Sequence, residues 1–420
     1  MNDKEKILFD QNADAGDRLS ALSSLGVPEI QRGGEWVNNH IHTTYSFSPY
    51  TPSAAVCCAR KAGLSTAGIM DHDSVGGISE FIEAGEIVSM PVTVGFECRT
   101  DVSGTPLEGK KLNNPDQNSV AYVTMHGIPH QNIDKCEKVL SPLREKRNIR
   151  NRKMCANINE ICRQIGVYVD FDKDVLPLSM YDRGGSVTER HVLFALTKKL
   201  VGGDRNEDIK RIETLCGTIA QKTAEKLLSA PQEYYLYDVL GVLKSSLVGR
   251  IYVDADEELM HITDFCKLAH RVGGICAYAY LGDVGESPTG DKAAQKFEDS
   301  YLDILMPALK DFGFDAVTYM PSRNTKEQLS RIMRLCDEYG FFQISGEDIN
   351  SPRQSFVCEA MAQYRHLYDA TYALIGHERL ASIDAANGMF SKNTLASMPS
   401  LSDRIRYFAE AGREVLHKKI

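Results

Sequence analysis

The chain has 420 residues, 43% of them hydrophobic and 25% charged, which is typical of a soluble globular protein with a sizeable core. Its net charge of −9 argues against a general attraction to nucleic acid or anionic membranes. No stretch approaches the roughly 20 apolar residues that cross a bilayer, and the polar N-terminus lacks the apolar segment of a secretory signal. We therefore expect a cytoplasmic protein without membrane partners.

The first part of the chain alternates between strand and helix patterns. Residues 1–34 predict a helical leader that ends at "RGG". Beyond it we expect strands near 35–42, 65–73, 91–98 and 118–129, with helices near 51–64 and 77–88. Strands that alternate with helices indicate βαβ units and a parallel sheet or barrel.

The second part begins with a long helical block and then returns to the alternation. Residues 141–262 are helical almost throughout, and strands are expected again near 275–283, 314–321 and 341–349, with helices near 256–274, 300–313 and 325–340. We interpret the chain as one α/β domain with a helical insertion. Its parts are the leader at 1–34, the barrel at 35–140 and 263–355, the inserted helical subdomain at 141–262 and a C-terminal helical extension at 356–420.

Two histidines close the first expected strand. In "WVNNHIHTTYSFSP", His40 and His42 are two residues apart and share one face of a strand, with Ile41 turned to the core. Both imidazoles could therefore point at one metal ion. An isolated His-x-His motif is weak evidence for a metal site, because buried histidines often form only structural hydrogen bonds.

Other strand ends repeat the same chemistry. They carry Asp71, His72, Asp73, Glu97, His126, Glu347 and Asp348. In a parallel barrel the carboxyl ends of all strands open onto one face, where active sites lie. Imidazole and carboxylate groups that converge there form a mixed nitrogen and oxygen site suited to Zn, Mn or Fe.

The motif order HxH, DHD, Glu, His and Asp resembles the PHP (polymerase and histidinol phosphatase) domain, a superfamily of metal-dependent phosphoesterases. The similarity is carried by "HIHTTYSFSPYTPS", "GIMDHDSVGG", "GFECR", "MHGIP", "GICAYAYLGD" and "ISGEDIN". It covers roughly residues 36–130 and 262–350, and the helical block between them resembles the insertion of the phosphoesterase branch, including "TERHVLFALTKK". The resemblance implies a distorted (β/α)7 TIM-like barrel with up to three metals.

The resemblance also implies a set of metal ligands. One ion would be held by His40, His42, Glu97 and Asp348. A second would share Glu97, add His126 and use the position of Tyr280. Tyr280 stands where the family has histidine, and it could either ligate as a phenolate or only form a hydrogen bond; we slightly favour the hydrogen bond.

A third ion would use the positions of Phe47, His72 and Asn350. Phe47 cannot ligate, and the neutral oxygen of Asn350 is a poor transition-metal ligand beside imidazole. We therefore expect one or two divalent ions and no third. In a catalytic site a metal lowers the pKa of bound water toward about 7. The catalytic roles would then fall to Asp348 and to His72, as a general acid or as a supporting residue.

Phosphate binding requires cations near the barrel mouth. Our candidates are Arg99, Arg190, His191 and Arg323, because guanidinium groups bind phosphate in bidentate geometry. Residues 143–153, "LREKRNIRNRK", form a basic run that we interpret as a solvated helix face. A nucleic-acid partner is possible but not favoured, since no aromatic residues interleave with the run.

Two functions follow from these features. The first is hydrolysis of a phosphate ester of a nucleotide or small phosphorylated metabolite by metal-activated water. The second is a metal-binding PHP relative whose catalysis is lost or altered and which acts as a binding or regulatory module, as the substitutions at Phe47, Tyr280 and Asn350 suggest. A weaker third option is hydrolysis of a bond other than a phosphate ester. The sequence leaves the substrate, the native metal and the oligomeric state open.

Overall fold

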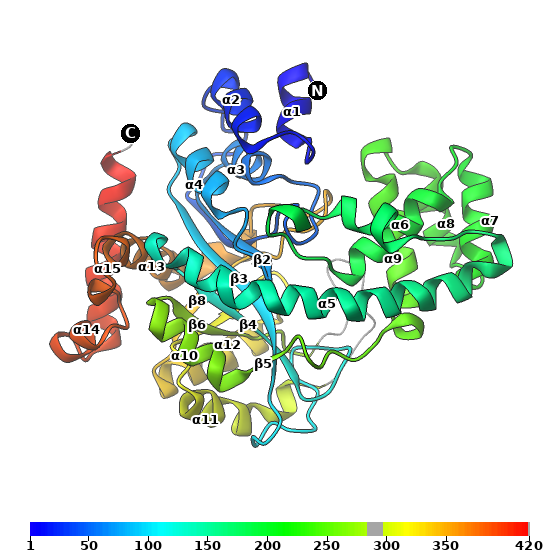
Figure 1. Ribbon diagram of the computed structural model, residues 1–420. Helices are drawn as coiled ribbons and strands as arrows, with labels where there is room; N and C mark the ends of the chain where they lie inside the picture. Colours follow the sequence, from blue (N-terminus) through cyan, green and yellow to red (C-terminus); the bar gives the residue numbers. More distant parts are fainter. Residues whose placement is uncertain (284–296, 419–420) are drawn as a thin grey trace.

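The computed structural model describes residues 1–283 and 297–418, and its central feature is a nearly closed, barrel-shaped sheet (Figure 1). Neighbouring strands follow the order β1, β2, β3, β4, β6, β7, β8, and the short β5 pairs with β3. The strands are β1 Trp36–Ile41, β2 Leu64–His72, β3 Val92–Asp101, β4 Val120–His126, β5 Met260–His261, β6 Ile275–Ala279, β7 Ala316–Tyr319 and β8 Phe342–Ser345. The TIM-like α/β barrel expected from the sequence is confirmed.

The expectation of an all-parallel sheet is wrong at β4. This strand runs antiparallel to both of its neighbours, β3 and β6. A parallel return from β3 would need a crossover, usually a helix, and residues 102–119 form none. At the other edge, the barrel closes where Ile41 bridges Ile349, just after β8. Backbone hydrogen bonds join Ile349 to His40 and His42 there, at 3.2 and 3.0 Å.

Helices surround the sheet. Those of the barrel are α3 Pro52–Lys61, α4 Ile78–Ile87, α10 Ile262–Val272, α11 Leu302–Phe312 and α12 Lys326–Tyr339. The segment expected to be helical from 256 becomes helical only at Ile262, because Met260 and His261 pair with β3 as β5. None of the described helices is both long and apolar enough to cross a membrane.

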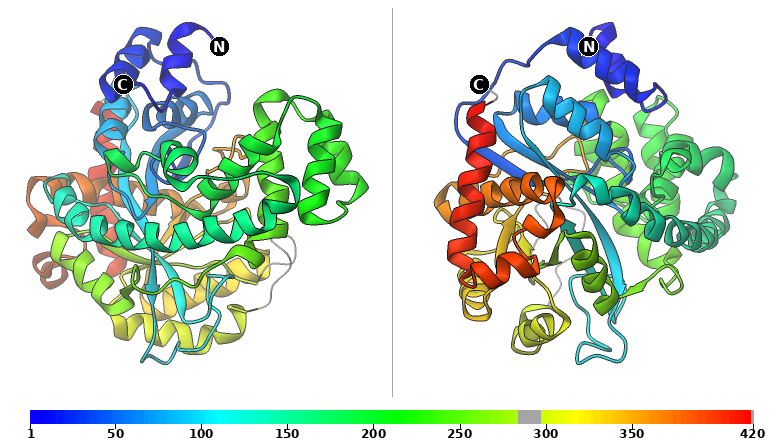
Figure 2. Two further views of the ribbon diagram at one scale, coloured as in Figure 1. Left: turned by 45° about the vertical axis from the view of Figure 1, so that its right-hand side comes forward. Right: turned by 60° about the vertical axis from the view of Figure 1, so that its left-hand side comes forward.

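The two ends of the chain add further helices. They are α1 Asp3–Phe9 and α2 Ala15–Leu25 at the N-terminus, and α13 Arg365–Ile383, α14 Lys392–Ser397 and α15 Leu401–Lys418 at the C-terminus. Figures 1 and 2 show the C-terminal helices on the side of the barrel opposite the α6–α9 lobe. Helix α13 packs on β8, β3 and β1.

The helical block inserted after β4 has its own hydrophobic cluster. Its helices are α5 Ile133–Cys162, α6 Glu189–Leu200, α7 Arg205–Cys216, α8 Gln221–Ser229 and α9 Gln232–Ile251. Helix α5 starts at Ile133, before the expected residue 141, and crosses from the barrel to the other four helices (Figure 1). One residue of the barrel, Phe47, belongs to this second cluster.

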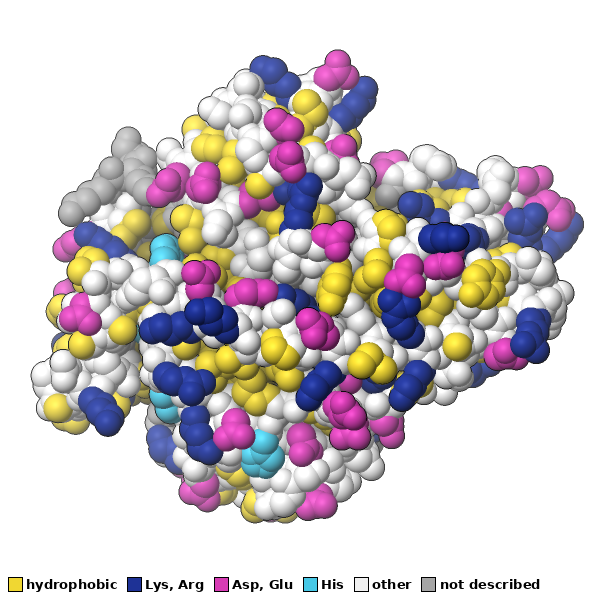
Figure 3. Space-filling view, viewed as in Figure 1, with side chains coloured by type: hydrophobic (Ala, Val, Ile, Leu, Met, Phe, Trp, Pro, Cys, Tyr) yellow, Lys and Arg dark blue, Asp and Glu magenta, His cyan; other side chains and the backbone are white. Residues whose placement is uncertain are grey.

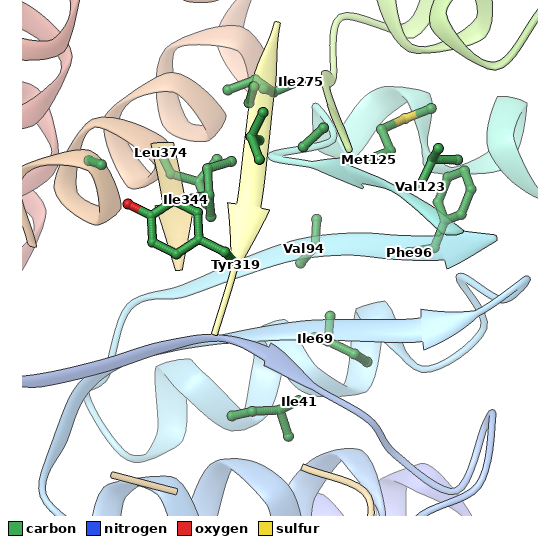
Figure 4. Packing of buried hydrophobic residues seen from close by; sticks show 14 of the residues in the cluster. Ile41, Ile69, Val94, Phe96, Val123, Met125, Ile275, Tyr319, Ile344 and Leu374 are labelled. Atoms are coloured by element: carbon green, nitrogen blue, oxygen red, sulfur yellow. The ribbon is translucent and has the colours of Figure 1, made fainter. Parts of the chain in front are cut away.

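The pleat of the strands separates apolar from polar side chains. Ile41, Ile69 and Val94 are register neighbours on β1, β2 and β3, and all three are buried in the main core (Figure 4). Successive side chains of a strand point to opposite faces. His72 and Glu97 are also register partners, and they lie on the other face, inside the mouth of the barrel.

Candidate metal centre

The end of β1 brings two buried imidazoles into the barrel mouth. The rings of His40 and His42 have centroids 5.1 Å apart. Ser46 Oγ donates to Asp71 at 2.6 Å and lies 3.2 Å from His42 Nδ1. Because the Ser46 proton goes to Asp71, Ser46 can accept the Nδ1 proton of His42. This contact leaves Nε2 as the ring atom that can bind a metal.

Glu97 lies between histidines from the first two strands. Glu97 Oε2 is 3.1 Å from His72 Nδ1 and 3.8 Å from His40 Nε2. The His72 ring also stacks on His42, with centroids 4.6 Å apart. The three strands therefore bring three imidazoles around one carboxylate, as the sequence predicted for His40, His42 and Glu97.

Asp348 joins the cluster from the loop after β8. Its Oδ1 lies 3.2 Å from His42 Nε2. The loop can approach β1 only because residue 346 is glycine, where a Cβ would lie 2.7 Å from the backbone nitrogen of His40. A side chain at Gly346 would therefore push the loop away from the metal centre.

These side chains form two overlapping groups that fit a metal ion. One contains His40, His42 and Asp348, and the other contains His42, His72 and Glu97. Within each group the donor atoms lie within 4.8 Å of one another. Histidine nitrogen with carboxylate oxygen is the donor set that Zn, Mn and Fe accept, so the residues fit the divalent ion that the sequence implied.

The electrostatics keep His40, His72 and Asp348 in the state that binds metals, whereas Asp348 raises the pKa of His42 against the effect of burial. Burial and the neighbouring His42 lower the pKa of His40 to about 4, and the same two causes lower the pKa of His72 well below its usual value. Burial alone would raise the pKa of Asp348, but His42 holds that pKa well below its usual range. At neutral pH His40 and His72 are therefore neutral and Asp348 is a carboxylate. A neutral His72 is suited to binding metal or accepting a proton.

His126 lies deeper in the barrel than expected. Because β4 is antiparallel, His126 pairs with Gly95, near the amino end of β3, and not at the mouth. It still faces the same side as Glu97, two residues along from its partner. Burial and nearby His40 lower its pKa to about 3, and its Nε2 has no hydrogen-bond partner among the described residues. A buried neutral imidazole with an unused nitrogen is compatible with a second metal ion.

Tyr280 makes a hydrogen bond at the predicted second site. Its buried hydroxyl donates to Asp299 Oδ1 at 2.5 Å. Burial and this bond raise the pKa of Tyr280, so the phenol stays protonated at neutral pH. A protonated phenol is a poor metal ligand, and the geometry corresponds to the hydrogen-bonded alternative.

Two of the four predicted phosphate contacts reach the pocket above the metal centre. This pocket has a volume of about 120 Å³, and its lining includes Arg190 and Arg323. The lining also includes Lys244 of α9, which sequence reasoning missed because α9 gave no motif around it.

The other two predicted phosphate contacts, Arg99 and His191, do not line this pocket. Arg99 Nη2 donates to the buried carboxylate of Glu258 at 2.8 Å. His191 Nδ1 accepts from the backbone of Thr188 at 2.9 Å and thereby caps α6. Both side chains already have structural roles, which short sequence motifs do not reveal.

Only one side of the basic run 143–153 is a solvated helix face: Lys146, Arg152 and Lys153 are exposed, whereas the other side is buried. Arg144, Arg147 and Arg150 are each less than 5% exposed. They recur every three residues, so they share one side of α5, and this side faces the barrel. Arg150 donates to Glu258 at 2.5 Å, and Arg147 pairs with Asp73. The spacing of these arginines was the signal that could have revealed their burial.

A larger cleft adjoins the pocket. It has a volume of about 600 Å³ and lies between α8–α9 of the insertion and the loops after β7 and β8. Leu227 and Leu240 line one wall, Met320 and Ile349 line the other, and Asp348 is shared with the pocket.

The face seen in Figure 3 mixes acidic and basic side chains without a large patch of one sign.

Comparison with known proteins supports the fold, and the evidence for a chemical function comes from the residues of the site. The sequence matches no family model and no curated protein. A candidate metal-dependent phosphoesterase from Bifidobacterium adolescentis superposes with a TM-score of 0.52 at 18% identity, covering 81% of this chain and 98% of that one. An amidohydrolase from Chromobacterium violaceum, described with bound sulfate and no metal, superposes with a TM-score of 0.50 at 16% identity over 80% and 96% of the two chains.

Proposed function

We propose that this protein is a metal-dependent phosphoesterase of the PHP type, acting on the phosphate ester of a nucleotide or small phosphorylated metabolite. The observation that carries the proposal is the convergence of His40, His42, Glu97 and Asp348 in two overlapping groups, beside a pocket that also contains arginine. A barrel held together only by packing would need none of these four side chains in contact. The two superposed proteins are described as a candidate phosphoesterase and an amidohydrolase, and both names denote hydrolases.

The metal ligands divide into a main and an accessory set. In the proposal, His40, His42, Glu97 and Asp348 hold one divalent ion, and Glu97 with His126 serves a second. The bound metal would acidify a water molecule and neutralise charge on the phosphoryl group. His42 is oriented for this task by Ser46 and Asp71, which fix its ring through the 3.2 and 2.6 Å contacts.

The remaining polar groups of the pocket bind and orient the substrate. Arg190 and Arg323 would contact the phosphoryl oxygens, because guanidinium groups match their geometry. His72 Nδ1, 3.1 Å from Glu97, would donate its proton to that carboxylate and hold it in place, which leaves His72 Nε2 as the ring atom that can accept a proton. The apolar side chains of the adjoining cleft, such as Leu240 and Met320, would contact the organic part of the ester.

A metal assay combined with a hydrolysis assay tests the proposal. We expect one or two ions per chain after mild purification, and Mn- or Zn-dependent hydrolysis of an aryl phosphate that disappears in His42→Ala. His366→Ala is the matched control, because His366 is exposed and lies on α13, away from the mouth. Metal-independent hydrolysis, or equal loss in both variants, would contradict the proposal.

The second function, a metal-binding relative without catalysis, is favoured by the replaced ligand positions. Phe47, Tyr280 and Asn350 all stand where the resemblance calls for ligands. This function predicts bound metal without turnover across a panel of nucleotides, sugar phosphates and aryl phosphates. An anilide in the same panel tests hydrolysis of an amide bond.

A further inference from the structure

A small hollow lies beside His72, next to the metal centre. Its lining includes Phe47, His72 and Asn350, the three positions that the family resemblance assigns to a third metal ion. The structure therefore brings these positions together, although two of them cannot ligate well. The same hollow is also lined by two arginines, Arg147 and Arg190, and by one carboxylate, Glu189.

The Arg147 guanidinium is fixed in this hollow by acidic partners. It is 3% exposed and comes from α5 of the insertion. Its Nη1 donates to Asp73, and its Nη2 lies 3.9 Å from Glu189. Arg144 donates to the backbone oxygen of the same Asp73 at 3.0 Å, which anchors the acid that holds Arg147. The guanidinium is therefore held in place by the fold, and it offsets the charge of these two carboxylates.

Asn350 connects a second guanidinium to a metal ligand. Its Oδ1 accepts from Arg190 Nη1 at 2.5 Å, and its Nδ2 donates to Asp348 Oδ1 at 2.6 Å. A neutral amide can make both contacts because it has a donor and an acceptor. An imidazole that bound a metal here would lose the contact with arginine.

Phe47 closes the hollow from the side of the insertion. Its ring packs edge-on against His191 and Phe194, with centroids 5.0 and 5.5 Å apart. Its backbone φ is 152°, a conformation that non-glycine residues rarely adopt. The contacts with α6 thus hold an apolar ring where a ligand would otherwise be.

We propose that Arg147 is a fixed cation that takes the place of a third metal ion, so that the site works with at most two ions and is completed by α5 of the insertion. The inference rests on the proposed phosphoesterase function. Arg147 is a positioning residue in this scheme: its charge acts on the bound phosphoryl group through the neighbouring His72 and Arg190. It also balances the carboxylates of Asp73 and Glu189, which would otherwise attract a further cation to the hollow.

Metal counting tests the replacement directly. In Phe47→Asp/Asn350→His, which restores two ligands beside His72, we expect the same number of Mn ions per chain as in the wild type. Adding Arg147→Met to this variant should raise the count by one. A third ion bound while Arg147 is present, or no extra ion after its removal, would overturn the proposal. These counts do not depend on turnover.

Binding of inorganic phosphate to the Mn-loaded chain tests the electrostatic role. We expect Arg147→Met to weaken phosphate binding roughly tenfold, the scale of a partly screened charge several ångströms away. Arg147→Lys should recover part of the loss, and this variant serves if Arg147→Met does not fold. Arg152→Met is the matched control, because Arg152 lies on the same helix in an exposed pair with Asp172.

The outcomes separate the two proposals. Unchanged phosphate binding in a folded Arg147→Met chain would overturn the inference while leaving the phosphoesterase function intact. A wild type that binds metal and phosphate but hydrolyses no ester would defeat the phosphoesterase function. The tenfold effect and the metal counts would then still support the role of Arg147.

Discussion

The two ends of the barrel both bury histidines and carboxylates, but they use them differently. At the amino end, under α13, His377 Nε2 lies 3.0 Å from the Gly127 oxygen and its Nδ1 accepts from the Met389 backbone at 2.9 Å. Glu378 accepts from the Val94 backbone at 2.8 Å and pairs with His130 at 2.9 Å. Each ring nitrogen and carboxylate oxygen of His377 and Glu378 thus has a partner.

At the mouth, the same residue types face one another. His40, His42, Glu97 and Asp348 form contacts mainly within their own group, and His42 and His72 stack ring on ring. Histidines and acids that are satisfied by the backbone stabilise the fold, whereas those that converge on a common point are arranged for a ligand. Residue type alone does not separate the two cases.

The largest expected difference between the two ends of the barrel is the loss of bound metal when the mouth is changed. His42→Ala should lose bound metal and more than about 100-fold of the activity, beyond the effect of removing an outer partner of a metal ligand. Its thermal stability without metal should change little, because His42 is buried among other polar side chains of the mouth and lies outside the hydrophobic cluster. Metal analysis and calorimetry in a chelator check both points. A strong loss of stability without metal would mean that the mouth, too, is structural.

At the amino end we expect the reverse. Glu378→Ala leaves the Val94 N–H buried without a partner and breaks the pair with His130, which should lower the free energy of unfolding by about 3 kcal/mol. Metal content and activity of the folded fraction should be unchanged. Urea unfolding and metal analysis check both points. Unchanged stability with loss of bound metal would show that Glu378 contributes to the metal centre instead.

Acid should weaken the amino end. Burial lowers the pKa of His377 to about 4, below its usual value near 6.5. Between these values the unfolded chain binds a proton that the folded chain does not, so stability falls as the pH falls from 6.5 toward 4. Between pH 7 and pH 5 the free energy of unfolding should fall by about 2 kcal/mol because of His377. The loss begins near pH 6.5 and amounts to about 1.4 kcal/mol per pH unit.

His377→Gln removes the titrating group. In a chelator, urea unfolding of this variant should therefore show a pH dependence between pH 7 and 5 that is shallower by about 2 kcal/mol than that of the wild type. Identical slopes for the two chains would show that His377 does not carry the effect.

The smallest expected effect concerns Tyr280. Tyr280→Phe removes the hydroxyl that donates to Asp299 and should cost about 1 kcal/mol of stability without changing the number of bound ions. If this variant binds one ion fewer than the wild type, Tyr280 is a metal ligand. Equilibrium unfolding and metal analysis of the same sample decide between the two.

The sequence predicted the barrel and most of the mouth because both follow local rules. Alternating strand and helix patterns predicted the fold, and the HxH spacing placed His40 and His42 on one side of β1. The antiparallel β4 was missed because apolar alternation does not encode strand direction, and His126 was consequently expected at the mouth.

The roles of the arginines depend on tertiary partners that are distant in sequence. Arg99 and Arg150 share Glu258, and Arg147 pairs with Asp73, more than 70 residues away. Short motifs contain no information about such partners. The spacing of the arginines on α5 predicts a shared side, but the sequence does not say what that side contacts.

The most direct test of the metal centre is anomalous X-ray diffraction from crystals grown with Mn or Zn. We predict a peak at the barrel mouth, about 2.0–2.2 Å from His40 and His42 nitrogens and from Glu97 and Asp348 oxygens. An empty mouth at saturating metal, with these four side chains still in contact with one another, would contradict it.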